Sequence, residues 1–278
     1  MLATPSDCLR NADLSVWLEN WDGRSAPAQV VEGIAGLGLE DVGRAGDRWA
    51  QVECPAQLLG HTHALLAFTR LARHRAHGGR VAIGLPCTPA GMAAAAQLLR
   101  RGISVGIGPV STPATWNAVA ECFTRALEER RAMGRAIDGV NCVAWVPVGL
   151  VDEHSDRCLP SGSPLHGTAG IAVAQLLYLL AFQTFAGPRW TQLRANGAQP
   201  VRLGWSRLAA ERRASYISRL TLPGSVIALG HPWAAEFDGH RLEVAEADET
   251  EARWTSQELV RCGVPLPEIL EDVARSPG

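Results

Sequence analysis

Short runs of apolar, largely β-branched residues alternate with longer helical patterns along most of this chain. A run at residues 49–54 precedes a helical segment at 58–79, and a run at 80–86 precedes an Ala/Leu-rich segment that Gly102 closes. Further runs lie at 103–110, 141–152, 199–206 and 224–232. This order predicts a parallel sheet covered by helices.

No glycine-rich phosphate fingerprint follows the first run, which favours a (β/α) barrel over a doubly wound dinucleotide fold. Residues 14–21 are a plausible extra strand, giving six clear strands and one plausible one. We therefore expect a (β/α)8 TIM-type barrel in a single domain, 1–278, with a shortened N-terminal part, 1–45. A missing strand would expose a sheet edge, which favours a homodimer.

Composition excludes several classes of partner. The net charge is −2 and charged residues make up 19% of the chain, so we expect neither a nucleic acid nor a membrane partner. The seven cysteines form no CxxC pair, and the N-terminus lacks a signal pattern. The longest apolar run, at 171–187, contains glutamines and reads as a buried helix. These features indicate a cytoplasmic protein with reduced thiols.

The chain contains no lysine, so all 26 fixed cations are arginines. A protein without lysine has no side-chain amine with which to form an imine. Only the α-amino group could substitute.

Five segments in succession resemble the transaldolase family. They are "VECPAQLLGHTHALLAFTRLA" (52–72), "RVAIGLPCTPAGMAAAAQLLRRGISVGIGPVST" (80–112), "VAWVPVGLVDEHSD" (143–156), "RWTQLRANGAQPVRLGWS" (189–206) and "LPGSVIALGHP" (222–232). The resemblance covers roughly residues 45 to 275, and it implies the same barrel fold.

The resemblance also implies which active-site groups have changed. The family's acid/base glutamate falls on Glu53. Its other site residues fall on positions that cannot do the same chemistry: the Schiff-base lysine on Gly84, an asparagine and a threonine on Gly106 and Gly108, a serine on Trp145, and the phosphate-binding arginine on Leu150. The imine mechanism is therefore not expected here.

Strand periodicity predicts which side chains face the barrel interior. Residues two apart share a face, so Trp49, Gln51 and Glu53 should point inward together. By the same parity Gly84, Gly106, Gly108 and Trp145 should line the interior. Three glycines in place of larger side chains would leave a void costing several kcal/mol if empty. Either Trp145 fills this space and closes the barrel, or the space admits a ligand bulkier and less polar than a sugar phosphate.

Glu53 has two interpretations. Burial without a lysine partner would raise its pKa, which suits general acid/base chemistry. Alternatively, Glu53 is a structural carboxylate hydrogen-bonded to Gln51 or to the backbone.

Other candidates lie where active sites of this fold are found, at the carboxyl ends of strands. Cys87, Thr88 and His231 lie there, and Trp49, Trp145 and Trp205 could form an aromatic pocket. Three further groups are weaker candidates. Arg207, Arg212 and Arg213 would either receive an acidic group of a ligand or face solvent. Asp152 is expected to be a loop acid or a helix cap. His61 and His63 do not share a helix face, so no metal site is expected.

Two functions follow. The first is a cofactor-free enzyme that uses Glu53 for acid/base chemistry on an apolar or aromatic carbonyl compound. An aldol-type condensation, a cyclisation or a lyase step in a specialised biosynthetic pathway would fit. The alternative is a catalytically dead pseudoenzyme that binds a partner or a metabolite.

Overall fold

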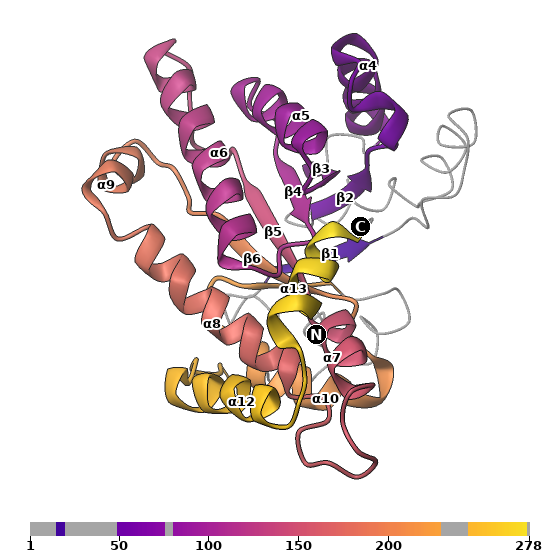
Figure 1. Cartoon of the computed structure of the whole chain (residues 1–278). Coiled ribbons are helices and arrows are strands. Elements are labelled where there is room, and N and C mark those ends of the chain that lie inside the picture. Colours follow the sequence, from indigo (N-terminus) through magenta and orange to yellow (C-terminus); the bar gives the residue numbers. More distant parts are fainter. Residues whose placement is uncertain (1–14, 20–48, 76–79, 229–243, 277–278) are drawn as a thin grey trace, which may run out of the picture.

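A ring of parallel strands forms the centre of the molecule (Figure 1). The computed structural model describes residues 15–19, 49–75, 80–228 and 244–276. Its strands are β1 Ser15–Glu19, β2 Trp49–Glu53, β3 Arg80–Pro86, β4 Val105–Gly108, β5 Cys142–Pro147, β6 Arg202–Ser206 and β7 Val226–Ala228. Strands β2 to β7 pair in chain order, and β1 pairs with β2 on one side and β7 on the other.

The barrel-type α/β architecture expected from the sequence is thus confirmed. The described residues supply seven strands, one fewer than an eight-stranded barrel, and the plausible strand at 14–21 is β1. Because β1 closes the ring, the described sheet has no open edge of the kind that favoured a homodimer. The single-domain boundaries and the homodimer stay predictions.

Helices follow the strands on the outside of the ring. Figure 1 shows α4, α5 and α6 along one side of the sheet, while α8 packs against α12. The helices are α4 Thr62–Arg75, α5 Pro89–Arg100, α6 Pro113–Ala132, α7 Val148–Asp156, α8 Ala169–Thr184, α9 Pro188–Arg194, α10 Arg213–Leu220, α12 Glu249–Arg261 and α13 Leu266–Arg275, with short 3-10 turns at Ala56–Leu58 and Ala210–Arg212.

Two helices that follow barrel strands begin with the same local chemistry. The Thr88 side chain accepts a hydrogen bond from the Gly91 N–H, and Thr112 forms a reciprocal capping box with Thr115. Each threonine precedes a proline at the first helical position, where the missing N–H costs nothing. These caps fix where the chain turns from strand to helix at the carboxyl ends of β3 and β4.

Two apolar layers hold the barrel. The larger lies between sheet and helices and includes Ile83, Ile107 and Val146 from the outward positions of the strands. The smaller lies inside the ring and comprises Ala82, Val143, Trp145, Val226 and Ala228. Alternating strand residues contribute to the two layers, as the pleat requires.

The last two helices bring the C-terminal segment back to the barrel. Gly263, at φ 87°, ends the first of them and allows the chain to turn into α13. The Ser111 hydroxyl, just after β4, donates to the Leu270 carbonyl at 2.7 Å, so α13 lies at the end of the barrel where β4 ends.

None of the described helices meets the length and apolarity of a membrane span by itself. The pair α8 and α9 meets both together, but it is bent by 81°.

Candidate functional site

Glu53 ends β2 and lies beside a strand position that carries no side chain. In the pairing register Glu53 is opposite Gly84 of β3, and Gly84 is opposite Gly106 of β4. A Cβ placed on Gly84 would lie 2.1–2.3 Å from the Glu53 carboxylate atoms. The glycine at position 84 therefore provides the space that the carboxylate occupies.

A chain of hydrogen bonds crosses the interior from Glu53 to the opposite strand. Gln51 Nε2 donates to Glu53 Oε1 at 2.5 Å, and Trp145 Nε1 donates to Gln51 Oε1 at 2.7 Å. We call these three residues the interior chain. The Gln51 and Trp145 side chains are each 5% exposed, whereas Glu53 is partly exposed. The inward direction expected for Gln51 and Glu53 agrees with these contacts.

Besides Gly84, glycines on β4 and β6 make room for the interior chain. A Cβ on Gly106 would lie 1.8 Å from Gln51 Oε1, and one on Gly204 would lie 2.4 Å from the Trp145 ring. A Cβ on Gly108 would lie 2.9 Å from the Trp145 Cβ. The void expected from the sequence is therefore occupied at these positions by an indole and an amide. Of the two alternatives, this arrangement corresponds to the barrel filled by Trp145, except that Glu53 keeps some exposure to solvent.

The protonation of Glu53 reflects three opposing influences. Burial disfavours the carboxylate and raises the pKa of Glu53, and this effect prevails. The hydrogen bond from Gln51 and the positive charge of Arg207 lower that pKa in part. Glu53 can therefore hold a proton at a higher pH than a solvated glutamate does.

Arg207 differs from the two other arginines that the sequence grouped with it. It follows β6, is exposed, and has a positive φ of 57°, which is uncommon for a residue with a side chain. Its carbonyl oxygen would lie 1.8 Å from a Cβ on Gly149, so only glycine fits at position 149. Arg212, by contrast, bonds Asp156 at 2.5 Å. Of the three, only Arg207 contributes to the pKa shift of Glu53.

Several predicted site residues do not join the interior chain. Trp205 was expected in an aromatic pocket, and this placement is wrong. Its indole is fully buried on the outer face of β6, where Nε1 donates to the Leu220 carbonyl at 2.8 Å. Gly204 takes the inward position on β6 instead, because strand faces alternate.

Thr88 and Cys87 lie at the end of β3, as expected, but neither side chain joins the interior chain. The Thr88 hydroxyl caps α5. Cys87 packs against the outer core, and burial raises the pKa of its thiol, which disfavours the nucleophilic thiolate. Trp49 is placed in β2 by its backbone alone, and its side chain and His231 lie outside the described residues.

Asp152 has a larger structural part than expected. It is not a loop acid, because it lies within α7 and is 1% exposed, but it does act as a helix cap, at the first turn of α8 and not at its own helix. Its carboxylate accepts from the Gly170 N–H at 2.7 Å and from the Tyr216 hydroxyl at 2.6 Å. It thereby joins α7 to α8 and α10, and burial raises its pKa. Sequence pattern alone gives no signal for this contact across the fold.

No group of three or more potential metal ligands gathers within the described part of the chain. Among the described residues, His61 and His63 therefore belong to no such group.

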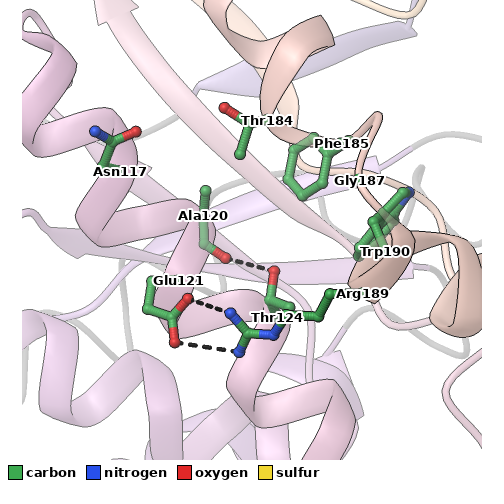
Figure 2. A pocket seen from close by; sticks show the side chains of 9 residues that line it. All are labelled: Asn117, Ala120, Glu121, Thr124, Thr184, Phe185, Gly187, Arg189 and Trp190. Carbon is green, nitrogen blue, oxygen red and sulfur yellow. Dashed lines mark hydrogen bonds and ion pairs between the residues drawn. The ribbon is translucent and has the colours of Figure 1, made fainter.

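A cavity of about 300 Å³ lies on the outside of the barrel between α6 and the α8–α9 turn (Figure 2). Phe185 and Trp190 line it together with Arg189, which forms ion pairs with Glu121 at 2.6 Å and Glu128 at 2.7 Å. No sequence motif marks this cavity, because its residues come from separate helices. Its one cation is already paired with two carboxylates.

Comparison with known proteins places the chain near one family. A transaldolase of Parafrankia sp. is 28% identical over 243 residues, which cover 83% of this chain and 66% of the relative. Transaldolase 1 of Streptomyces coelicolor is 27% identical, over 89% of this chain and 67% of its own length. The chain is a distant relative of transaldolases.

The similarity has limits. A transaldolase of Frankia alni is 29% identical over 68% of this chain, but the match covers only 54% of that relative. The chain thus spans between about half and two thirds of the length of these relatives. No protein-family model matches it.

Proposed function

We propose that this transaldolase-related barrel performs acid/base chemistry with Glu53 as the catalytic group and without an imine. The observation that carries the proposal is the setting of Glu53. Its carboxylate lies at the wall of the barrel interior, keeps some exposure and accepts one hydrogen bond, and its pKa is raised by burial. A carboxyl group whose pKa is raised in this way can take up and return a proton at a higher pH than a solvated glutamate does.

Two observations support a mechanism without an imine. The sequence has no lysine, so no side-chain amine is present to attack a carbonyl carbon. In the proposed correspondence with transaldolases, Gly84 takes the position of the Schiff-base lysine. A side chain there would collide with the Glu53 carboxylate, so the arrangement favours Glu53 in a space that an amine would otherwise need.

The substrate proposed is a carbonyl compound that is largely apolar and not phosphorylated. Apolar side chains, including Val143, Val226 and Ala228, form the inner layer of the barrel. In the proposed step the Glu53 carboxylate takes a proton from the carbon next to the carbonyl. The electrons of the broken C–H bond pass to the carbonyl oxygen, and Glu53 later returns the proton. A condensation, a cyclisation or a lyase reaction of a specialised biosynthetic pathway can begin this way, with no cofactor.

The second candidate is a pseudoenzyme that binds a partner or metabolite without turnover. The buried indole of Trp145 favours it, because this side chain occupies interior space next to Gly106 and Gly204. The two candidates differ in whether Glu53 exchanges protons with a bound carbonyl compound.

Deuterium exchange separates them. The protein is incubated in D₂O with a panel of aliphatic and aromatic ketones and aldehydes, and deuterium at the α-carbon is followed by mass spectrometry. We expect at least one compound to exchange, and Glu53→Gln to abolish the exchange. The control is Glu211→Gln, which removes an exposed carboxylate and should retain it. No exchange across the panel would favour the pseudoenzyme. Full exchange with Glu53→Gln would contradict Glu53 as the catalytic group.

Borohydride trapping tests the imine directly. With the same carbonyl compounds we expect no stable adduct. A reduced adduct on the α-amino group would overturn the proposed mechanism.

A further inference from the structure

The order of groups in the interior chain fixes the orientation of the Gln51 amide. An indole N–H can only donate, so the amide atom that faces Trp145 must be the oxygen. The amide nitrogen then faces Glu53 and donates to its carboxylate. A flipped amide would place two donors against each other at Trp145 and an acceptor against an ionised carboxylate at Glu53.

We propose that Trp145 is a positioning residue for Glu53: its indole N–H holds the Gln51 amide in the orientation that donates to the carboxylate. This inference rests on the proposed function, in which Glu53 is the acid/base group. The resemblance to transaldolases does not imply this role, because the position of Trp145 corresponds to a serine in that family.

The structure leaves Trp145 little freedom to move. Its side chain is 5% exposed, and its ring lies directly over Gly204 on the neighbouring strand β6, where a Cβ would lie 2.4 Å from it. Gly106 on β4 faces both the Trp145 nitrogen and the Gln51 oxygen, and a Cβ there would lie 2.6 Å and 1.8 Å from them. The glycines on both sides thus let the indole and the amide meet at hydrogen-bond distance.

The consequence concerns the proton on Glu53. Among the described residues, Gln51 and the positive charge of Arg207 at the end of β6 act on the Glu53 carboxylate, and β3 presents Gly84 at the paired position. The neighbouring Cys54 thiol is neutral near pH 7, since burial and the Glu53 charge raise its pKa to about 12. A donating Gln51 favours the ionised carboxylate, whereas a flipped Gln51 would accept from the protonated form. Removing the indole N–H therefore favours the protonated form.

The experiment measures the pKa of Glu53 by ¹³C NMR with carboxyl-labelled glutamate, its signal assigned by its loss in Glu53→Gln. Trp145→Phe keeps an aromatic ring but removes the N–H, and it should shift the Glu53 pKa upward. Gln51→Leu should also shift it upward. In the double variant Trp145→Phe should add nothing to Gln51→Leu, because its effect passes through Gln51. The measurement is made on the protein alone, without a substrate.

Trp205→Phe is the matched control. It also removes a buried indole N–H with a hydrogen bond of 2.8 Å, but on the outer face of the adjacent strand. We expect it to leave the pKa of Glu53 unchanged. If Trp205→Phe shifts that pKa as far as Trp145→Phe does, loosening of the barrel explains both and the inference fails.

Two further results would overturn the inference: an unchanged or lowered pKa in Trp145→Phe, or its full effect persisting in the Gln51→Leu background. Failure of the proposed function is a separate result. In that case the pKa shifts occur as expected, but Glu53→Gln leaves α-carbon exchange unchanged or no compound exchanges.

Discussion

Replacing Gly106 by alanine tests whether the barrel interior is filled as described. The new Cβ would lie 1.8 Å from Gln51 Oε1 and 2.6 Å from Trp145 Nε1, well inside the contact distance of about 3.5 Å. Both neighbours are buried and hydrogen-bonded to each other, so neither can move without losing that bond. The amide must be displaced from the indole, from the carboxylate, or from both.

The expected cost has three parts. Overpacking of a filled interior costs about 1–3 kcal/mol, and the displaced hydrogen bonds add about 1–3 kcal/mol. Alanine restricts the unfolded chain more than glycine does, which offsets about 0.4–1 kcal/mol. We therefore expect Gly106→Ala to lower the free energy of unfolding by about 1–5 kcal/mol.

The assay is urea unfolding followed by far-UV circular dichroism and by tryptophan fluorescence. Gly60→Ala is the control, because nothing lies within 4 Å of its Cβ and its φ is ordinary. It should change stability by less than about 1 kcal/mol. Gly84→Ala should fall between the two, since its Cβ meets only the end of the partly exposed Glu53 side chain. If Gly106→Ala is as stable as Gly60→Ala, the interior chain is not arranged as described.

Three further predictions concern charge, buried polar contacts and thiols. Because the pKa of Glu53 is raised on folding, the folded state binds more protons than the unfolded state between the ordinary and the raised pKa, and stability falls as pH rises through that window. Glu53→Gln should therefore be more stable than the wild type at pH 7 in thermal unfolding, and this advantage should disappear toward pH 4. An equal advantage at both pH values would contradict this prediction. Asp152→Asn should lower the free energy of unfolding in urea by about 1–3 kcal/mol, since the amide nitrogen of asparagine cannot accept a hydrogen bond and the carboxylate accepts from both Gly170 and Tyr216. An unchanged free energy of unfolding would show that these hydrogen bonds do not hold α7 to α8 and α10. Iodoacetamide should label the exposed Cys158 and Cys262 before Cys87 and the fully buried Cys142, as followed by peptide mass spectrometry, and Cys87 labelling as fast as Cys158 would refute its assignment as an unreactive thiol.

The sequence was sufficient for the barrel because its signals are local. Short apolar runs and the helix-closing Gly102 indicate where strands and helices begin and end, and these agree with β3, α5 and β4. Parity along each strand was sufficient for the inward faces of Gln51 and Glu53, because each strand is short and regular. It would also have been sufficient for Trp205, which lies one residue after the inward Gly204.

The sequence was not sufficient for contacts between distant strands. That Trp145 bonds Gln51 depends on the diameter of the ring and on which rotamers fit inside it, and 94 residues separate the two. The same holds for the contact of Asp152 with Tyr216, across 64 residues. The sequence alone therefore does not decide whether an indole or a ligand fills the interior.

The most direct test of the central claim is the protonation of Glu53 in the wild-type protein. The carboxyl stretch of Glu53 is followed by infrared spectroscopy as a function of pD, as the difference between wild type and Glu53→Gln. A midpoint clearly above the ordinary glutamate range is predicted, because burial outweighs the Gln51 hydrogen bond and the Arg207 charge. A midpoint at or below the ordinary value would mean that the carboxylate is solvated, and it would contradict Glu53 as the acid/base group of this barrel.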